Sequence, residues 1–376
     1  MRGRAVAGAT LAVALFVAVG SLRGTVEPSV AGSTTAPTPA TSAPSPRVLP
    51  FRPAERAVNW RVYEVPPGTI TARADPEHVM LSSIDEPGDG QAQGVLTVQA
   101  RDGSGLQTSY RPRPAGWEPA DWQLLDGALY VVEVLIDQGE GLGSRLMRVD
   151  LGSGLAREIP IRSVKRLAPS LLTVGDELIG TGTSAKNPIE QCAIAIRPSS
   201  GAERTVACGI VLPIIESADG GVLIKLPDNS PDGCAVRLLM PGRGEFGLPV
   251  FVGYCRQRQI IPLGGWQAYH VDGPGPAQPL LATDGVDNIV LGTAKIAAVA
   301  CHGRLYWVSG GRKDSPYGVE VLRWTPGAPE VEVVYRSRGR TELGWPSCTE
   351  GTLGVPVRSS AADGSRLLAL RVLDRP

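Results

Sequence analysis

Short runs of apolar residues, each preceded by a pair of turn-forming residues, recur along most of the chain. Clear examples are residues 128–134, 221–226 and 304–309, which are rich in Val, Ile, Leu, Tyr and Trp. Such runs, bounded by Gly, Pro, Asn or Asp, are typical of β-strands. The 46 Gly and 33 Pro are spread along the chain, a spacing that long helices would not tolerate. The pattern therefore predicts an all-β protein.

Two kinds of turn repeat together with these runs. The first is a pair of small or acidic residues between two apolar runs, at Asp75-Pro76, Asp126-Gly127, Gly175-Asp176, Asp219-Gly220, Gly264-Gly265, His302-Gly303 and Glu350-Gly351. The second is a glycine-containing hairpin later in each repeat, at residues 101–105, 150–154, 198–201, 241–244, 272–275 and 325–327. Self-similarity at a period of about 40 to 50 residues is typical of propellers and solenoids.

We therefore predict a β-propeller of seven four-stranded blades. Residues 212–252 contain all four expected strands of one repeat. Residues 258–284 are short and weakly patterned, so six blades is the alternative. The second kind of turn occurs one time fewer than the first, which indicates that the last blade lacks its outer strand. Residues 58–65 precede the first repeat and have the composition of a strand, so they are predicted to complete that blade and close the ring.

Some of the turns also resemble those of a known family. Residues 216–224, 230–233 and 360–368 are similar to the S-x-D-G turn-then-strand repeat of TolB-like or WD40-like bacterial propellers. The resemblance covers three repeats. It implies an extracytoplasmic propeller and carries over neither a partner nor a site.

The N-terminal region differs from the rest of the chain. Arg2 and Arg4 precede an uncharged stretch over residues 5–22, so residues 1–24 are predicted to be a signal peptide or a membrane anchor. Both alternatives place the body outside the membrane. Residues 25–50 are rich in Pro, Thr, Ser and Ala and are predicted to form a disordered tether. The propeller domain is then residues 51–376.

All six cysteines lie in the predicted propeller, and export favours disulfides. Cys192 and Cys208 fall opposite each other if residues 198–201 form a hairpin, and Cys234 and Cys255 flank a second hairpin in the same way. Directly opposed residues of antiparallel strands are close enough to bridge. Cys301 and Cys348 remain as the third pair.

Charge and motifs exclude several classes of function. The 37 basic and 37 acidic residues balance, so nucleic acid is not a predicted partner, and the membrane is reached only through the N-terminal segment. The chain contains no G-x-S-x-G, C-x-x-C or H-E-x-x-H motif, and its three His lie in separate repeats. The G-x-G-x-x-G of residues 242–247 is interpreted as a hairpin, because no helix follows it. No cofactor, metal or catalytic set is predicted.

The predicted topology separates charge between two faces. Because strands alternate in direction, both kinds of turn share one face, and the connections between blades lie on the other. The connections carry Arg111, Arg113, Arg162, Lys165, Arg166, Arg256, Arg258, Arg336, Arg338 and Arg340, whereas the turn face carries Asp75, Glu77, Asp126, Asp176, Glu177, Asp219 and Glu350. A concave basic funnel would attract an anionic envelope polymer or an acidic protein surface. The alternative is that these arginines serve solubility alone.

Two function classes follow. The favoured one is a non-catalytic binding or scaffold module outside the membrane, with the basic residues as its binding face. The alternative is a propeller hydrolase or lyase, with Glu133, Asp137 and Glu140 as candidate acid-base groups by residue type. Carboxylates that converge in the funnel would favour the enzyme. A funnel lined only by Arg and aliphatic residues would favour the binding module.

Overall fold

The computed structural model describes residues 46–55, 58–85, 93–105, 107–114, 116–137, 140–209, 214–218, 221–227, 234–240, 244–247, 260–271, 277–295, 297–310, 317–359 and 366–374. The chain divides into residues 1–44 and a body of residues 45–376, and all the described residues belong to the body. Its described elements are all strands, as expected of a β-propeller. None of the described residues forms a helix that could span a membrane.

The first four sheets each contain four consecutive antiparallel strands. Sheet 1 comprises β4 (Thr69–Ala74), β5 (His78–Asp85), β6 (Gln93–Ala100) and β7 (Gln107–Tyr110). Sheet 2 comprises β8 (Trp117–Leu125), β9 (Ala128–Asp137), β10 (Glu140–Asp150) and β11 (Ala156–Ile159). Sheet 3 comprises β12 (Val164–Val174), β13 (Glu177–Ser184), β14 (Gln191–Arg197) and β15 (Ala202–Gly209). Sheet 4 comprises β16 (Ile214–Ala218), β17 (Gly221–Pro227), β18 (Cys234–Met240) and β19 (Gly244–Gly247).

The other three sheets each recruit a strand from the N-terminal part of the body. Sheet 5 comprises β20 (Ile260–Leu263), β21 (Trp266–His270), β22 (Gln278–Thr283), β23 (Asn288–Ala294) and β1 (Arg47–Val48). Sheet 6 comprises β24 (Val299–Cys301), β25 (Arg304–Ser309), β26 (Glu320–Trp324), β27 (Val331–Arg336) and β2 (Phe51–Pro53). Sheet 7 comprises β28 (Thr341–Leu343), β29 (Ser347–Thr349), β30 (Thr352–Ser359), β31 (Leu367–Asp374) and β3 (Arg61–Glu64).

The repeated pairs of small or acidic residues each lie between the first and second strands of a sheet. At Asp126-Gly127, His302-Gly303 and Glu350-Gly351 both φ angles are positive, between 48° and 75°. Two successive positive φ values are the requirement of a type I′ turn, whose twist matches that of antiparallel strands. Tight turns therefore set the register of the innermost hairpins. Asp219-Gly220 lies outside the described residues, between the strands β16 and β17.

The hydrophobic core lies between successive sheets. One cluster of buried residues joins sheets 2 and 3, another joins sheets 5 and 6, and a third joins sheets 6 and 7. A further cluster joins sheet 7 to sheet 1, through Leu370 and Val372 on β31 and Ala72 and Val79 on β4 and β5. Contacts thus run from each sheet to the next in the chain and from the last back to the first.

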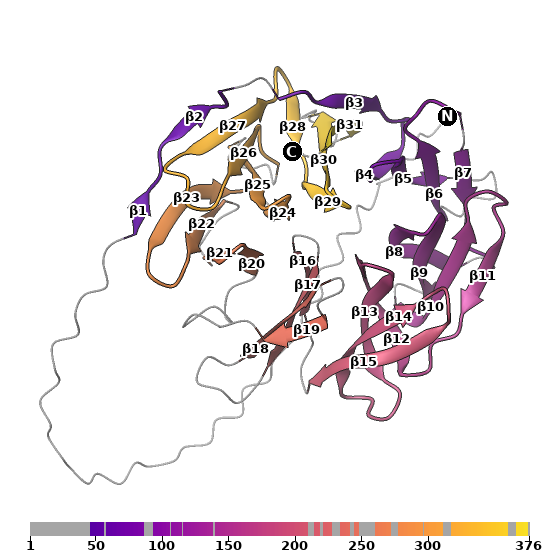
Figure 1. The fold of residues 1–376 in the computed structure, drawn as a ribbon. Helices are drawn as coiled ribbons and strands as arrows, with labels where there is room; N and C mark the ends of the chain where they lie inside the picture. Colours follow the sequence, from indigo (N-terminus) through magenta and orange to yellow (C-terminus); the bar gives the residue numbers. More distant parts are fainter. Residues whose placement is uncertain are drawn as a thin grey trace, which may run out of the picture. The chain divides into compact units, whose positions relative to one another are not determined.

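An N-terminal strap, residues 47–55 and 58–64, runs along the outer edges of three sheets (Figure 1). The strand β3 pairs antiparallel with β31, which confirms the predicted closure of the last repeat. The strands β1 and β2, which the sequence did not predict, pair in parallel with β23 and β27. Between them, Leu49 is 3% exposed and packs into the cluster that joins sheets 5 and 6. The strap therefore covers three sheet edges that would otherwise be open.

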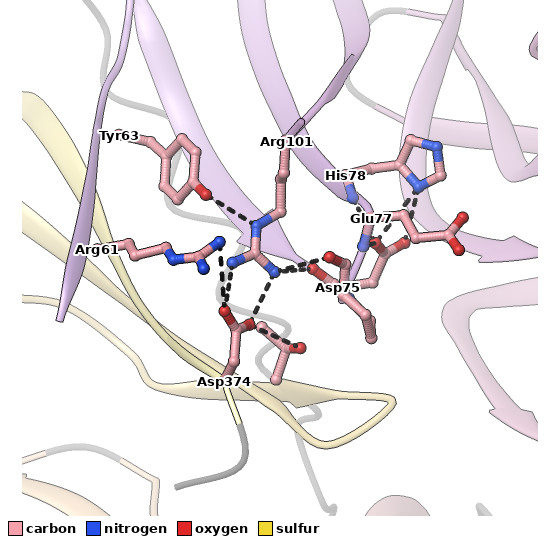
Figure 2. Close-up of polar contacts among 9 residues, drawn as sticks. Arg61, Tyr63, Asp75, Glu77, His78, Arg101 and Asp374 are labelled. Carbon is pink, nitrogen blue, oxygen red and sulfur yellow. Dashed lines mark hydrogen bonds and ion pairs between the residues drawn. The ribbon is translucent and has the colours of Figure 1, made fainter. Parts of the chain in front are cut away.

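A buried arginine fastens the first sheet to the last (Figure 2). The Arg101 side chain is 3% exposed, and its Nη1 and Nη2 atoms donate to both carboxylate oxygens of Asp374 at 2.9 and 2.8 Å. Its Nε atom donates to the Tyr63 hydroxyl at 3.0 Å, and Nη1 also donates to the carbonyl of Asp75 at 2.6 Å. One side chain of sheet 1 thus holds the strap strand β3 and the end of β31 together.

Two disulfides join cysteines of the described residues. Cys192 and Cys208 are directly opposed on β14 and β15, with Cα atoms 4.1 Å apart, as predicted. Cys301 on β24 bonds Cys348 on β29, so this bridge links the first strands of sheets 6 and 7. The predicted partner of Cys234, Cys255, lies outside the described residues. Two disulfides are typical of an oxidising compartment outside the cytoplasm.

Candidate functional site

A cavity of about 810 Å³ is lined mainly by the first strands of the sheets. Residues of β4, β8, β12, β24 and β29 form its wall. Polar and aromatic side chains that line it are Thr71, Arg73, Asp121, Gln123, Thr173, Tyr317, Trp345, Ser347, Thr349, Glu350 and Arg358. A cavity with two guanidinium groups, two carboxylates and a phenol has the donors and acceptors that acid-base chemistry requires.

A polar belt on β4, β8 and β12 holds one side of the cavity rigid. The Arg73 Nη1 atom donates to Asp121 Oδ1 at 3.1 Å, and the guanidinium lies 4.9 Å from the centroid of the Trp122 ring. Asp121 Oδ2 accepts from the backbone N–H of Leu171 at 2.8 Å. Gln123 Nε2 donates to the carbonyl of the same leucine at 2.7 Å. These contacts cross two sheet boundaries, so this belt joins sheets 1, 2 and 3.

The opposite side of the cavity is formed where the first strand of sheet 7 is interrupted. Both β28 and β29 pair with β30, and Gly344, Trp345 and Pro346 separate them. Proline has no N–H to donate, so it interrupts a ladder of strand hydrogen bonds. Trp345 at the break is 63% exposed and lines the cavity. A large exposed aromatic face in a cavity suits stacking on an apolar or sugar ring.

Tyr317 and Arg358 meet beside this break. A bridge between Gly318 and Leu343 pairs the loop after β25 with β28, and Leu343 N–H donates to the Gly318 carbonyl at 2.7 Å. That bridge places Tyr317 over the cavity, where the Arg358 guanidinium lies 5.0 Å from the centroid of its ring. Arg358 Nη2 donates to the carbonyl of Ile70 on β4 at 2.8 Å. Backbone contacts with β28 and β4 therefore fix the pair.

The end of the cavity at the turns is acidic. Glu350, in the turn between β29 and β30, lines the cavity. Partial burial raises the pKa of its carboxyl, and so do the nearby carboxylates of Asp75, Glu77 and Asp126. Three of these four residues lie in the repeated inner turns, and Glu77 follows one of them. The carboxylates expected on the turn face are thus close enough to interact.

The basic residues predicted from the connections lie apart from this cavity. Among those described, Lys165, Arg166 and Arg338 are exposed, and none of the predicted basic residues lines it. Arg111 forms an ion pair with Asp85, and Arg336 Nε donates to Glu320 at 2.8 Å. Arg162 and Arg340 are also exposed, whereas Arg256 and Arg258 lie outside the described residues. The cationic groups of the cavity are instead Arg73 and Arg358, which lie within the strands β4 and β30 and not in the connections between blades.

The candidate acid-base residues of the sequence analysis are not in the cavity either. Glu133 is fully buried on β9, where it accepts hydrogen bonds from Arg145 Nε at 2.6 Å and from the Tyr110 hydroxyl. Burial, and then its hydrogen bond to Glu133, raises the pKa of Tyr110. This buried group is a structural contact between sheets 1 and 2. The backbones of Asp137 and Glu140 pair at the far end of β9 and β10, and their side chains lie outside the described part.

Comparison with known proteins identifies the architecture. No family model and no curated protein matches the chain. Solved β-propellers do. The β-propeller domain of the Trilobed protease from Pyrococcus furiosus has a TM-score of 0.55 at 12% identity, covering 84% of this chain and 94% of that one. The polysaccharide lyase Uly1 has a TM-score of 0.52 at 10% identity, covering 81% and 89%.

A third similar structure is the acylaminoacyl peptidase of Pyrococcus horikoshii, with a TM-score of 0.50 at 10% identity. The match covers 84% of this chain and 51% of the peptidase. This chain therefore spans about half the length of that enzyme. At these identities the likeness shows the propeller fold alone.

The expectation of a non-catalytic binding module is corrected by these observations. The similar propellers belong to a protease, a peptidase and a polysaccharide lyase, so these comparisons do not support a non-catalytic binding module. The cavity is also not lined only by Arg and aliphatic residues, the arrangement expected of a binding module, because Asp121, Glu350 and Tyr317 line it alongside the two arginines. The earlier preference rested on charges in surface loops, and it missed polar side chains that alternate inward along the first strands.

Proposed function

We propose that this protein is an exported propeller enzyme of the hydrolase or lyase class that acts on an anionic polysaccharide in its central cavity. Of the two reactions, β-elimination from a uronate-containing chain fits the cavity best. The observation that carries the proposal is the grouping of Arg358, Tyr317 and Trp345 at one wall of the cavity. Two of the three similar propellers are parts of peptidases, and the third is a polysaccharide lyase.

β-Elimination requires neutralisation of the uronate carboxylate, removal of the C5 proton and protonation of the departing oxygen. A cation must neutralise the uronate carboxylate so that the adjacent C5–H becomes acidic, and Arg358 offers a guanidinium for that contact. A base then removes the C5 proton, the C4–O bond breaks, a C4=C5 double bond forms, and the departing oxygen receives a proton. We assign both proton transfers to the Tyr317 phenolic oxygen, which takes the proton from C5 as the base and gives a proton to the departing oxygen as the acid. The exposed Trp345 face suits stacking on a sugar ring.

Hydrolysis is less well supported by the carboxylates. Glycoside hydrolysis by two carboxyl groups needs one acid and one base or nucleophile, both free to act on the bond. Asp121 Oδ1 accepts from Arg73 and from the N–H of Trp122 at 2.9 Å, and Oδ2 accepts from Leu171. Since both oxygens are engaged with the framework, Asp121 is better suited to positioning Arg73 than to attacking a substrate.

Activity on a panel of polysaccharides tests the proposal. The mature protein is incubated with uronate-containing and neutral polysaccharides and with peptides, and both reducing ends and ultraviolet absorbance of a conjugated double bond are followed. Elimination produces both signals together, whereas hydrolysis produces reducing ends alone. We expect both signals with a uronate polymer and neither signal with neutral polymers or peptides.

Two matched tyrosine variants separate a role in the reaction from a role in folding. In each, an arginine lies over the ring: Arg358 over Tyr317 at 5.0 Å, and Arg371 over Tyr335 at 4.1 Å. Tyr317→Phe should lower kcat at least about a hundredfold, the lower range for a positioned acid or base. Tyr335→Phe, outside the cavity, should leave kcat unchanged. Equal activity of the two variants, or no activity of the wild type on any uronate polymer, would refute the proposal.

Export is part of the same proposal. The disulfides fit an oxidising compartment, and residues 1–24 would direct the chain there, either as a cleaved signal or as a membrane anchor. The resemblance of three turns to those of TolB-like propellers also agrees with a location outside the cytoplasm. Sequencing the N-terminus of the native protein decides between the alternatives, because a cleaved chain begins after Gly20 and an anchored one retains residues 5–22.

A further inference from the structure

A second, separate groove lies between sheets 6 and 7. It has a volume of about 640 Å³ and is lined by Tyr335, Arg336, Arg338, Thr341, Val357 and Arg371. The first three residues lie at the end of β27 and in the connection after it, whereas Val357 and Arg371 lie on β30 and β31. None of the six lines the central cavity. The groove is therefore distinct from the proposed active site.

Three of the six lining residues are arginines, and none of the six is acidic. Arg336 is the least available, because it forms an ion pair with Glu320 through Nε at 2.8 Å. The groove therefore has an excess of positive charge from Arg338 and Arg371. Guanidinium groups bind carboxylate, sulfate and phosphate oxygens in a planar, two-pronged geometry.

The strap positions one of these arginines. The Arg371 guanidinium lies 4.1 Å from the centroid of the Tyr335 ring, and Val62 of β3 is its directly opposed residue. Trp60 of the strap packs edge-on against Tyr335, with ring centroids 6.0 Å apart, and its Nε1 atom donates to the Val334 carbonyl at 3.3 Å. Tyr335 is thus held by Trp60 and Arg371. A guanidinium fixed in this way is pre-organised for a ligand.

The loop that carries Arg338 is also fixed. Thr341 Oγ1 donates to the carbonyl of Arg338 at 2.6 Å, and Ser337 Oγ donates to the carbonyl of Thr341 at 2.9 Å. Gly339 between them has a φ of 65°, a conformation that glycine adopts without strain. The turn therefore holds the backbone of an exposed arginine at the edge of the groove.

Arg338 and Arg371 have no acidic partner among the described residues, in contrast to Arg336, which is paired with Glu320. A guanidinium that is held in place and not neutralised by a carboxylate favours an anionic ligand. From the excess charge and the two fixed arginines, we propose that the groove is an oxyanion-binding site, which takes a carboxylate, sulfate or phosphate group independently of the reaction in the central cavity.

Calorimetric titration with three probes tests this site. Inorganic phosphate, sulfate and glucuronate are each titrated into the mature protein at low salt. We expect saturable binding of at least one probe, and the probe that binds distinguishes a tetrahedral anion from a carboxylate. Arg371→Gln and Arg338→Ala should each weaken that binding about tenfold, the loss expected for one hydrogen bond to a charged group.

Arg166→Ala is the matched control, because it removes one exposed positive charge on β12, outside the groove. It should leave the affinity unchanged. Thermal melting checks that each variant is folded, and Arg338→Ala decides the question if Arg371→Gln is unfolded, because Arg338 is an exposed loop residue. The site is refuted if no probe saturates, if Arg338→Ala binds like the wild type, or if Arg166→Ala weakens binding equally. None of these results depends on whether the protein cleaves polysaccharides.

Discussion

At the scale of single residues, Arg101 contacts three separate parts of the fold. It binds Asp374 of the last strand, Tyr63 of the strap and the carbonyl of Asp75 in an inner turn. The Arg101 side chain is 3% exposed, so water cannot take over its hydrogen bonds if it is removed, and the free energy of unfolding should fall. Asp374 is 39% exposed, so water can replace part of the hydrogen bonding that its carboxylate would lose without Arg101.

Replacing this arginine should therefore destabilise the body without altering the central cavity. We expect Arg101→Met to lower the free energy of unfolding by about 2 kcal/mol, the scale of a lost hydrogen bond to a charged group. Chemical denaturation of the mature protein measures it. As a control, Arg197→Met removes an exposed pair with Asp176 and should change the free energy of unfolding by less than about 1 kcal/mol. Equal effects of the two variants would contradict the role of Arg101.

The same contact predicts a dependence of stability on pH. The hydrogen bonds from Arg101 lower the pKa of Asp374 below its usual value. A carboxyl with a lowered pKa in the folded protein stabilises it above the unfolded pKa of about 4, and this contribution is lost as the pH falls through the folded value. Melting temperatures from pH 6 to pH 3 should therefore decline less steeply in Asp374→Asn than in the wild type. Parallel curves would show that the pair contributes nothing.

At the scale of elements, the two disulfides join different kinds of neighbours. Cys192–Cys208 links adjacent strands of one sheet and closes a loop with a sequence separation of 16 residues. Cys301–Cys348 links two sheets, with a separation of 47. In the chain-entropy model these loops are worth about 3 and about 4 kcal/mol.

Removing the bridge between sheets should therefore be the more damaging change. We expect the Cys301→Ala, Cys348→Ala protein to melt at a lower temperature than the Cys192→Ala, Cys208→Ala protein. Scanning calorimetry of both double variants measures the difference. The reverse order would indicate that the link between sheets 6 and 7 is unimportant for stability.

The strap provides a second test at this scale. A protein that starts at Ser45 retains all three strap strands, one that starts at Val58 retains only β3, and one that starts at Pro66 retains none. Loss of β1 and β2 exposes the edges of β23 and β27 and removes Leu49, whose burial alone is worth about 2 kcal/mol. We expect the second protein to melt earlier than the first, and the third to aggregate. Equal melting temperatures would contradict closure by the strap.

Much at the element level was predictable from the sequence, for identifiable reasons. The inner turns were found because type I′ turns require positive φ at both positions, which restricts the residues to Gly, Asp and a few others. The closing strand was found from the unequal numbers of the two turns. The strands β1 and β2 were not found, because short parallel edge strands leave no alternating pattern in residues 47–53. The open edges of β23 and β27, with which β1 and β2 pair, determine where these two short strands form.

At the scale of the whole molecule, the site was less predictable than the fold. A repeat places its first strands around one cavity, but the sequence does not say which of their side chains converge there. Arg73, Asp121 and Arg358 belong to three different sheets, and Tyr317 is brought in by a bridge between neighbouring sheets. The cavity therefore depends on contacts between residues far apart in the chain. Of the loop charges that the sequence displays directly, Glu350 lines this cavity, whereas the described basic residues of the connections lie outside it.

The central claim is that this cavity eliminates, rather than hydrolyses, a uronate polymer. Mass spectrometry of the products tests it most directly, because elimination leaves each new non-reducing end one water lighter than hydrolysis does. We predict products with that deficit from the wild type and from Tyr335→Phe, and none from Tyr317→Phe. Products that carry the full mass of water, or products that form equally in Tyr317→Phe, would contradict the account.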